Sequence, residues 1–221
     1  MNCVFCEDDM GSHIKLGNTD YNRLILDDEN WLIYPTIGAF VEGYILHVLK
    51  RHTQSSFYCT KNELDSLLLN IHRISIIYKR VYRMNYAYIF EHGTIGAAYQ
   101  TTCCIEHTHI HMLPAPMDIL FGIVKDIHTP LYPVPSLIDC YSIIENRKIL
   151  SYIILGEVSA SSYFVLDCTA GLYPSQFMRM KMYKELVNGS LLDYGWDWRV
   201  KPYNENIKKT KEALNPLFQK F

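Results

Sequence analysis

Three histidines alternate along one short stretch of the chain. The segment CCIEHTHIHMLP, residues 103–114, holds His107, His109 and His111. Side chains two residues apart in a β-strand point to the same face, so a strand here would carry a row of imidazoles about 13 Å long. A neutral imidazole can ligate a metal ion, move a proton or attack an electrophile. The plainer interpretation of such a row is a polar stripe facing solvent or a structural metal site.

The elements around this stretch predict an α+β fold, an antiparallel sheet of about five strands packed by a long helix. The predicted strands are residues 31–34, 43–49, 86–93 and the histidine stretch. Pro114 is expected to end the last of these, because proline cannot donate to a β ladder. Thr60 followed by Glu63 is typical of a capping box, and apolar residues then recur at helical spacing, which predicts a helix from about 61 to 83.

The second half of the chain predicts a hairpin and two helices beyond an irregular, proline-rich stretch over residues 116–147. The hairpin is expected around residues 159–161, and the helices at about 175–187, beginning at Pro174, and 204–218. We therefore expect a core over residues 1–115 and a C-terminal extension over 116–221 that packs on it, together forming one continuous domain.

Three motifs in order resemble one family. HTHIHML at residues 107–113 matches the HxHxHxx signature of the histidine triad (HIT) proteins, which are nucleotide hydrolases and nucleotidyl transferases. CVFC at residues 3–6 is similar to the Cys-x-x-Cys opening of many members, and EGYILHVLKRH at 42–52 resembles their Gly-His-x-Leu-x-x-Pro-Lys-x-His strand. The resemblance covers about residues 1–114 and implies a HIT-like fold.

The resemblance implies covalent chemistry at phosphorus. His109 matches the middle histidine, which in the family attacks the α-phosphorus of a nucleotide ester, anhydride or amidate to give a phospho-histidine intermediate. Its other ring nitrogen should then donate to a fixed acceptor such as a backbone carbonyl. His111 would hydrogen-bond the phosphate oxygens and oppose the charge that builds in the transition state.

Candidate substrate contacts precede and follow the triad. In many family members, an asparagine and a serine or threonine before the triad contact the phosphate, and the candidates in that region here are His92, Gln100, Thr102 and Cys104. His92 is otherwise a polar residue at the end of a strand. Arg179, on a predicted helix, could clamp a phosphate with its planar guanidinium, and the alternative for it is a solvated helix face.

Four residues are candidates for a metal site. Cys3 and Cys6 have the spacing of a metal knuckle. In family members with this opening, the zinc is completed by two histidines whose positions match His52 and His107, with His47 as a rival for His52. Two thiolates and two imidazoles saturate tetrahedral zinc, so one structural zinc ion per chain is expected. The alternative is a frayed terminus that binds nothing.

Composition excludes several classes of protein. The formal net charge of -2 gives no electrostatic signal for nucleic acid or for an anionic membrane surface. No apolar run approaches the ~20 residues of a membrane span, and MNCVFCEDD lacks the pattern of a signal peptide. Seven scattered cysteines are typical of thiols or metal ligands in a reducing compartment. A cytoplasmic protein is expected.

The leading hypothesis is an enzyme that hydrolyses or transfers a nucleotidyl group, with a nucleotide or nucleotide conjugate as substrate. The alternative is a non-catalytic nucleotide-binding or nucleotide-sensing protein, favoured by Pro35, Thr36 and Ile37, which replace the acidic segment that holds the ribose in purine-binding family members. A pure zinc protein is disfavoured, since one zinc would leave His109 and His111 free. The family habit also predicts a homodimer.

Overall fold

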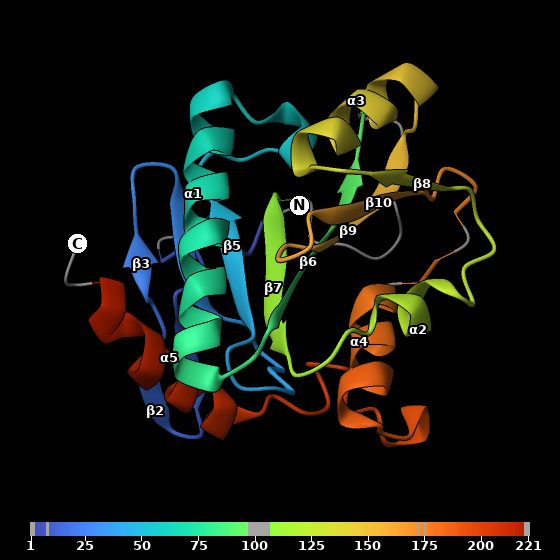
Figure 1. Ribbon diagram of the computed structural model, residues 1–221. Helices are drawn as coiled ribbons and strands as arrows, with labels where there is room; N and C mark the ends of the chain where they lie inside the picture. The colour runs from blue at the N-terminus through green and yellow to red at the C-terminus, as the bar shows by residue number, and fades with distance from the viewer. Residues whose placement is uncertain (1–2, 8, 97–106, 172, 175, 219–221) are drawn as a thin grey trace.

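One eight-stranded antiparallel sheet dominates the part of the chain that the computed structural model describes, residues 3–7, 9–96, 107–171, 173–174 and 176–218 (Figure 1). Its order is β3-β4-β5-β7-β6-β9-β10-β8. The strands are β3 (Leu26–Asp27), β4 (Trp31–Pro35), β5 (Ile45–Leu49), β6 (Tyr86–Thr94), β7 (His109–Ala115), β8 (Leu131–Val134), β9 (Ser151–Glu157) and β10 (Ser162–Asp167). A separate hairpin pairs β1 (His13–Leu16) with β2 (Thr19–Asn22). The predicted α+β class is confirmed, and the sheet exceeds the predicted five strands.

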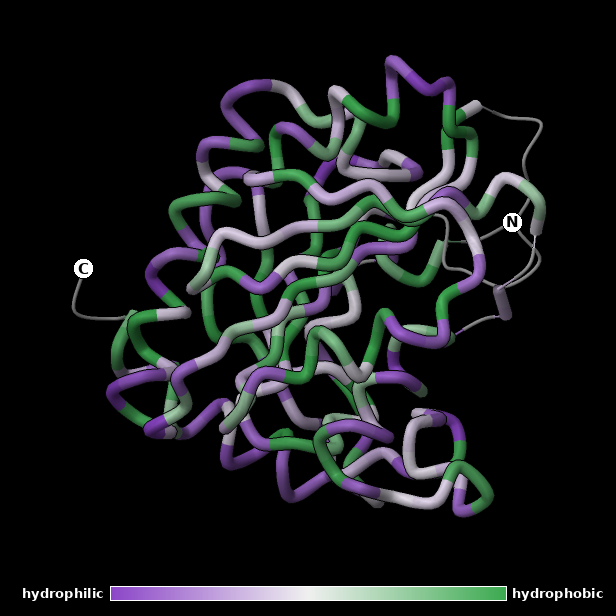
Figure 2. Tube along the Cα trace, turned by 45° about the vertical axis from the view of Figure 1, so that its right-hand side comes forward, coloured by the Kyte–Doolittle hydropathy of each residue, from purple (hydrophilic) through white to green (hydrophobic). Residues whose placement is uncertain are grey.

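Alternation along the strands builds two cores, one on each face of the sheet. In β9, Tyr152 and Ile154 join one core while Ile153 and Leu155 join the other. This is the period-2 pattern of a strand buried on both sides. Figure 2 shows hydrophobic residues along the central strands and hydrophilic ones gathered in outer turns.

Helices cover both faces. Helix α1 (Lys61–Ile77) and α3 (Leu137–Arg147) supply residues to the first core, and α2 (Leu120–Val124) and α4 (Phe177–Val187) supply the second. Helix α5 (Asn204–Phe218) contributes to both. None of the helices in the described ranges is long and apolar enough to cross a membrane.

The long helix begins where the capping box predicts. The Glu63 backbone N–H donates to Thr60 Oγ1 at 3.3 Å, and the Thr60 backbone N–H donates to Glu63 Oε2 at 2.6 Å. After Ile77 the helix continues as one π-helical turn, Tyr78–Tyr82, and ends at Arg83 in a left-handed conformation with φ 55°. The predicted span of 61–83 is therefore confirmed.

Two predictions about the histidine strand are wrong. β7 begins at His109, so His107 lies two residues before the strand rather than within a row of three. The strand also runs past Pro114 to Ala115. Pairing between β5 and β7 stops at Met112, so the missing N–H of Pro114 interrupts no ladder on that side.

In the second half, the hairpin at 159–161 and the helix at 204–218 form as predicted. Residues 116–147 are not irregular, since they hold α2, β8 and α3. Helix α3 has a start signal that the sequence reading missed: Ser136 accepts from the Asp139 backbone N–H at 3.2 Å.

Helix α4 begins at Phe177 rather than at Pro174, because Gln176 at its N-cap is left-handed with φ 62°. Strand β9 pairs directly with β6, and the boundary at residue 115 stays an expectation.

Candidate active site

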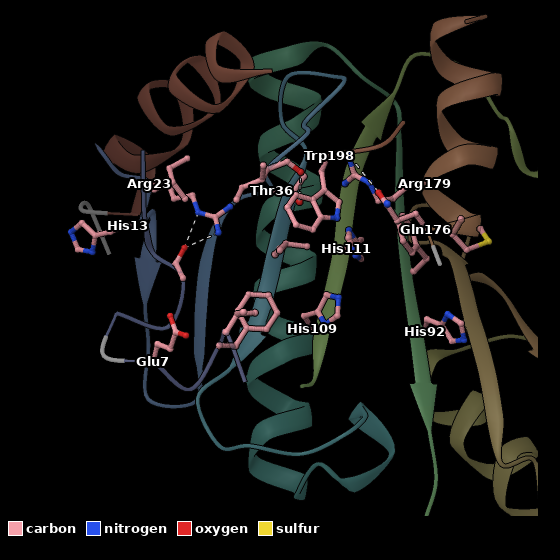
Figure 3. Close-up of a pocket in the computed structure, with 18 of the residues that line it drawn as sticks. Glu7, His13, Arg23, Thr36, His92, His109, His111, Gln176, Arg179 and Trp198 are labelled. Atoms are coloured by element: carbon pink, nitrogen blue, oxygen red, sulfur yellow. Dashed lines mark hydrogen bonds between the residues drawn. The ribbon is translucent and has the colours of Figure 1, made fainter. Parts of the chain in front are cut away.

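Strand β7 places two of the three histidines in the wall of a cavity of about 390 Å³ (Figure 3). Pairing with β5 and β6 sets His111 between Leu46 and Phe90. Ile110 and Met112 turn toward α1, so His109 and His111 face the cavity on the opposite side of the sheet. The sheet thus fixes the two imidazoles on a rigid base.

The hydrogen bonding of His109 leaves a free lone pair. Its Nδ1 lies 2.7 Å from the carbonyl oxygen of His107, which can only accept, so Nδ1 carries the proton. Burial lowers the pKa of His109, and the ring is therefore neutral near pH 7. Nε2 is left unprotonated, which is the nucleophilic form of imidazole. The donation to a backbone carbonyl expected from the sequence is present.

His111 has the opposite tautomer. Its Nδ1 lies 2.9 Å from the hydroxyl of Tyr44, whose pKa is raised to about 12 by burial, so the hydroxyl keeps its proton and donates it. Burial also holds the pKa of His111 well below its usual range. A neutral imidazole that accepts at Nδ1 must carry its proton at Nε2. His111 therefore offers a donor beside His109, and the two rings lie 5.2 Å apart.

Packing holds both rings in place. Phe90 stacks on His111 with ring centroids 4.3 Å apart and planes within 7°. Phe5, from the N-terminal segment, contacts the rings of His107 and His109, each at 5.4 Å. Rotation of either imidazole away from its present orientation would break these aromatic contacts. The two rings therefore keep their orientation before any ligand binds.

The four predicted metal ligands lie together. The ligand atoms of Cys3, Cys6, His52 and His107 are all within 4.8 Å of one another. Cys6 Sγ is 3.1 Å from His52 Nδ1, and the Nδ1 atoms of His52 and His107 are 3.2 Å apart. Four ligands around one zinc ion would be separated by about 3.3–3.7 Å, so this spacing fits. The group could hold a metal ion.

The outer contacts of the cluster suit a metal site. His107 Nε2 donates to the Leu49 carbonyl at 2.6 Å, which leaves Nδ1 as the lone pair that faces the thiols. His47, the rival for His52, lies on the opposite face of β5 and is absent from the cluster. Phe5, between the two cysteines, is buried, so this segment packs on the rest of the fold.

The remaining predicted contacts fall into three groups. His92 lines the cavity, and burial and the charge of His109 lower its pKa to about 4. Arg179 lines the cavity as well and is 3 % exposed, so a solvated helix face is wrong for it. Gln100, Thr102 and Cys104 lie outside the described residues.

Sequence reasoning missed several residues of the site. Tyr44 orients His111, and Arg23, Thr36 and Trp198 line the cavity. Tyr44 lies on the strand predicted at residues 43–49, two residues before Leu46, which pairs with His111. An aromatic ring such as Trp198 can stack on a base, but only the packing of the C-terminal segment brings it to this wall.

Comparison with known proteins gives structural likeness alone. No family model matches the sequence, and no curated protein is significantly similar to it. A Zn-bound histidine triad family protein from Mycobacterium smegmatis is 22% identical with a TM-score of 0.38, covering 52% of this chain and 75% of that one. A HIT family protein from Bacillus anthracis is 20% identical with a TM-score of 0.38, covering 51% and 72%.

A further solved structure is a Hit-like protein involved in cell-cycle regulation from Bartonella henselae. It is 16% identical with a TM-score of 0.34, and the match spans 41% of this chain and 66% of that one, just under two thirds of its length. These proteins carry the family name that the HTHIHML motif predicts. The likeness is one of fold alone.

Proposed function

We propose that this chain is a histidine triad enzyme that hydrolyses or transfers a nucleotidyl group through His109. The observation that carries the proposal is the pair of complementary tautomers. One imidazole is held with a lone pair at Nε2, and its neighbour is held with a proton at Nε2. A site that only binds a phosphate gains nothing from a neutral, oriented nucleophile.

In the first step, Nε2 of His109 attacks the α-phosphorus. A P–N bond forms as the P–O or P–N bond to the leaving group breaks, and the leaving group departs with the electron pair and takes a proton from water. His111 donates from Nε2 to a phosphoryl oxygen, where charge builds in the transition state. In the second step, the oxygen of water or of another acceptor bonds to phosphorus as the P–N bond to His109 breaks, and the acceptor gives up its proton to water.

Other cavity residues have supporting roles in this proposal. His92 contacts the substrate, and its lowered pKa keeps it neutral, so it can donate one hydrogen bond from one ring nitrogen and accept one at the other. Arg179 contacts a phosphoryl group. Gln100, Thr102 and Cys104 stay candidates for phosphate contacts.

The cysteine and histidine cluster is proposed to hold one structural zinc ion on Cys3, Cys6, His52 and His107. Four protein ligands leave no open position, so zinc there would hold structure and supply no reacting group. The cluster joins the N-terminal segment to the residues just before β7. Val4 and Phe5 line the cavity, so a metal ion in the cluster would also hold this part of the cavity wall in place.

A product screen tests the proposal. Wild-type protein, His109→Ala and the matched control His128→Ala, an exposed histidine that does not line the cavity, would be incubated with nucleoside phosphoramidates, nucleotide sugars and dinucleoside polyphosphates. We expect wild type and the control to release a nucleoside monophosphate and His109→Ala to release none. Mass spectrometry under non-acidic conditions should find a nucleotidyl adduct on His109, with zinc counted on the same samples.

Nucleotide binding without turnover would overturn the enzyme and favour the binding-protein alternative. Equal turnover by His109→Ala would overturn the assigned nucleophile. The predicted homodimer stays a prediction, which light scattering on the same samples would check.

A further inference from the structure

Arg179 is a buried cation that lies beside the tyrosine of the triad site. Its side chain extends from α4 and is 3 % exposed, on the cavity wall that His111 also lines (Figure 3). The guanidinium carbon is 5.2 Å from the ring centroid of Tyr44, whose hydroxyl lies 2.9 Å from His111 Nδ1. Arg179, Tyr44 and His111 therefore follow one another in space, although they come from distant parts of the chain.

Two backbone carbonyls hold the guanidinium in this place. Nε donates to the Trp196 carbonyl at 3.1 Å, and Nη2 donates to the Gly38 carbonyl at 2.5 Å. Within the described part of the chain, no carboxylate forms an ion pair with Arg179. Asp197 accepts instead from Arg199, whose Nε and Nη2 lie 2.9 Å from its two carboxylate oxygens. The charge of Arg179 is thus oriented but not neutralised.

The turn between β4 and β5 leaves room for the guanidinium. Gly38 has φ +74°, and a Cβ there would lie 2.6 Å from Arg179 Nη2 and 2.7 Å from Trp198 Cα. The Gly38 backbone N–H also donates to the Pro202 carbonyl at 2.9 Å, which fastens the C-terminal segment to this turn. A larger residue at this position would have to displace the guanidinium, so the close approach requires glycine.

A guanidinium restricts what a neighbouring hydroxyl can do. Arginine has donors and no acceptor, so it offers nothing to which the Tyr44 proton could bond. Burial raises the pKa of Tyr44 to about 12, and the charge and hydrogen bonding of Arg179 act against that rise. The hydroxyl thus keeps its proton, is polarised by the cation, and is directed to His111 Nδ1 as a donor.

The same charge acts on the ring of His111. Burial is the main cause that holds the pKa of His111 well below its usual range, and the charges of His109 and Arg179 lower it further. A cation beside the ring opposes the binding of a second proton. The imidazole therefore stays neutral, and its single proton stays at Nε2.

We propose that Arg179 is a positioning residue of the triad site, which turns the Tyr44 hydroxyl toward His111 and so keeps the proton of His111 at Nε2. The inference rests on the proposed function for the use of that proton, whereas the arrangement itself needs no substrate. It gives the C-terminal extension a part in the chemistry, because α4 supplies Arg179. A contact between Arg179 and a phosphoryl group would be additional to this role.

Nitrogen-15 NMR with ring-labelled histidine tests the arrangement without turnover, and His111→Asn identifies the signals of His111. Wild type should show the Nε2–H form. Arg179→Met, which removes the charge and the donors, should shift the ratio of the two tautomers at least about fivefold toward Nδ1–H. Arg179→Lys keeps the charge and should shift the ratio less than about twofold. Arg80→Met removes an exposed arginine outside the cavity and should leave the ratio unchanged.

Two results of this measurement would overturn the inference. One is an unchanged ratio in Arg179→Met, which would leave Arg179 with packing or substrate contact alone, and the other is an Nδ1–H form in wild type. If Arg179→Met fails to fold, Arg179→Gln replaces it, because its amide can still donate to a backbone carbonyl. Its amide oxygen can accept the Tyr44 proton, so the same shift is expected.

Rates then test whether the effect passes through Tyr44. Arg179→Met should lower kcat by about tenfold, and the double variant with Tyr44→Phe should be no more than about twofold slower than Tyr44→Phe alone. Losses that multiply would overturn the inference, because Arg179 would then act by another route. A wild type without turnover would overturn the proposed function, and the tautomer ratio would still decide this inference.

Discussion

A half-buried histidine and a fully buried one lie on neighbouring strands but on opposite faces of the sheet. His111 on β7 faces the cavity, where Tyr44 and Phe90 hold its ring. His47 on β5 is fully buried on the face that α1 covers, and neither of its ring nitrogens makes a hydrogen bond of normal geometry to the described part of the chain, although the Ile110 backbone is near. Both rings are uncharged near pH 7, since burial lowers both pKa values.

The two histidines differ in the hydrogen bonding of their ring nitrogens. On the cavity face, the contact at Nδ1 of each ring determines which nitrogen carries the proton, so Nε2 becomes a defined donor or a defined lone pair. On the helix face, the same residue type leaves two polar atoms unsatisfied, which costs stability and produces no chemistry. We therefore expect changes on the cavity face to alter activity and the change at His47 to alter stability.

The largest expected effect is at the nucleophile. His109→Ala should lower single-turnover rates by at least about 10³-fold, because His109 is the proposed acceptor of the nucleotidyl unit. Its free energy of unfolding, measured with urea, should change by less than about 2 kcal/mol. A rate within tenfold of wild type would place the chemistry elsewhere.

Next comes the hydroxyl that sets the tautomer of His111. Tyr44→Phe should lower kcat by about 10- to 100-fold, because either ring nitrogen of His111 could then carry the proton. Tyr152→Phe is the matched control, since it also removes a buried hydroxyl, which lies 3.1 Å from Glu91 Oε2 on the other face. If both variants lose kcat equally, the tautomer argument fails.

On the helix face, His47→Leu should raise the free energy of unfolding by about 1–3 kcal/mol at pH 7, because it removes two unsatisfied polar atoms from the core. Turnover should stay within twofold of wild type. Urea unfolding and steady-state rates on one preparation check both outcomes, and a loss of stability would show that His47 has a partner such as an internal water.

The smallest expected effect is a pH dependence. Burial lowers the pKa of His47 from 6.5 to about 4. Between these two pH values, the unfolded chain binds a proton at His47 and the folded chain does not. Folding stability is therefore lost as pH falls through this window, by about 1 kcal/mol between pH 7 and 5.5. Glu91, whose pKa burial raises to about 7, acts in the opposite direction in both proteins.

The difference in unfolding free energy between wild type and His47→Leu cancels the contribution of Glu91. That difference should widen as pH falls from 7 to 5.5. A constant difference would mean that His47 is protonated alike in both states.

Much of the fold was predictable from local signals. The capping box at Thr60 and Glu63 and the hairpin at 159–161 depend on residues near one another in the chain, and both predictions are confirmed. Helix α3 was not predicted, because its cap, Ser136, follows several prolines. Prolines at such spacing indicate an irregular segment. The position of His107 before β7 depends on its bond to Leu49, a contact across 58 residues.

The site divides in the same way. The family resemblance, which the motifs carry, was enough to select His109, His111 and the cluster of possible metal ligands. Arg23 could not be selected, because its acceptors at Gly11 and Pro35 are brought together only by the packed fold. Arg179 could be selected as a cation, but its burial depends on a glycine 141 residues away.

The cavity wall draws on both ends of the chain, from Val4 to Trp198. During synthesis, the triad strand is therefore made long before the segment that closes the cavity over it. A ribosome-bound chain that has released β7 but not Trp198 carries both imidazoles in an unfinished site. Full nucleotide binding should therefore appear late in translation, as an all-or-none property of the finished molecule.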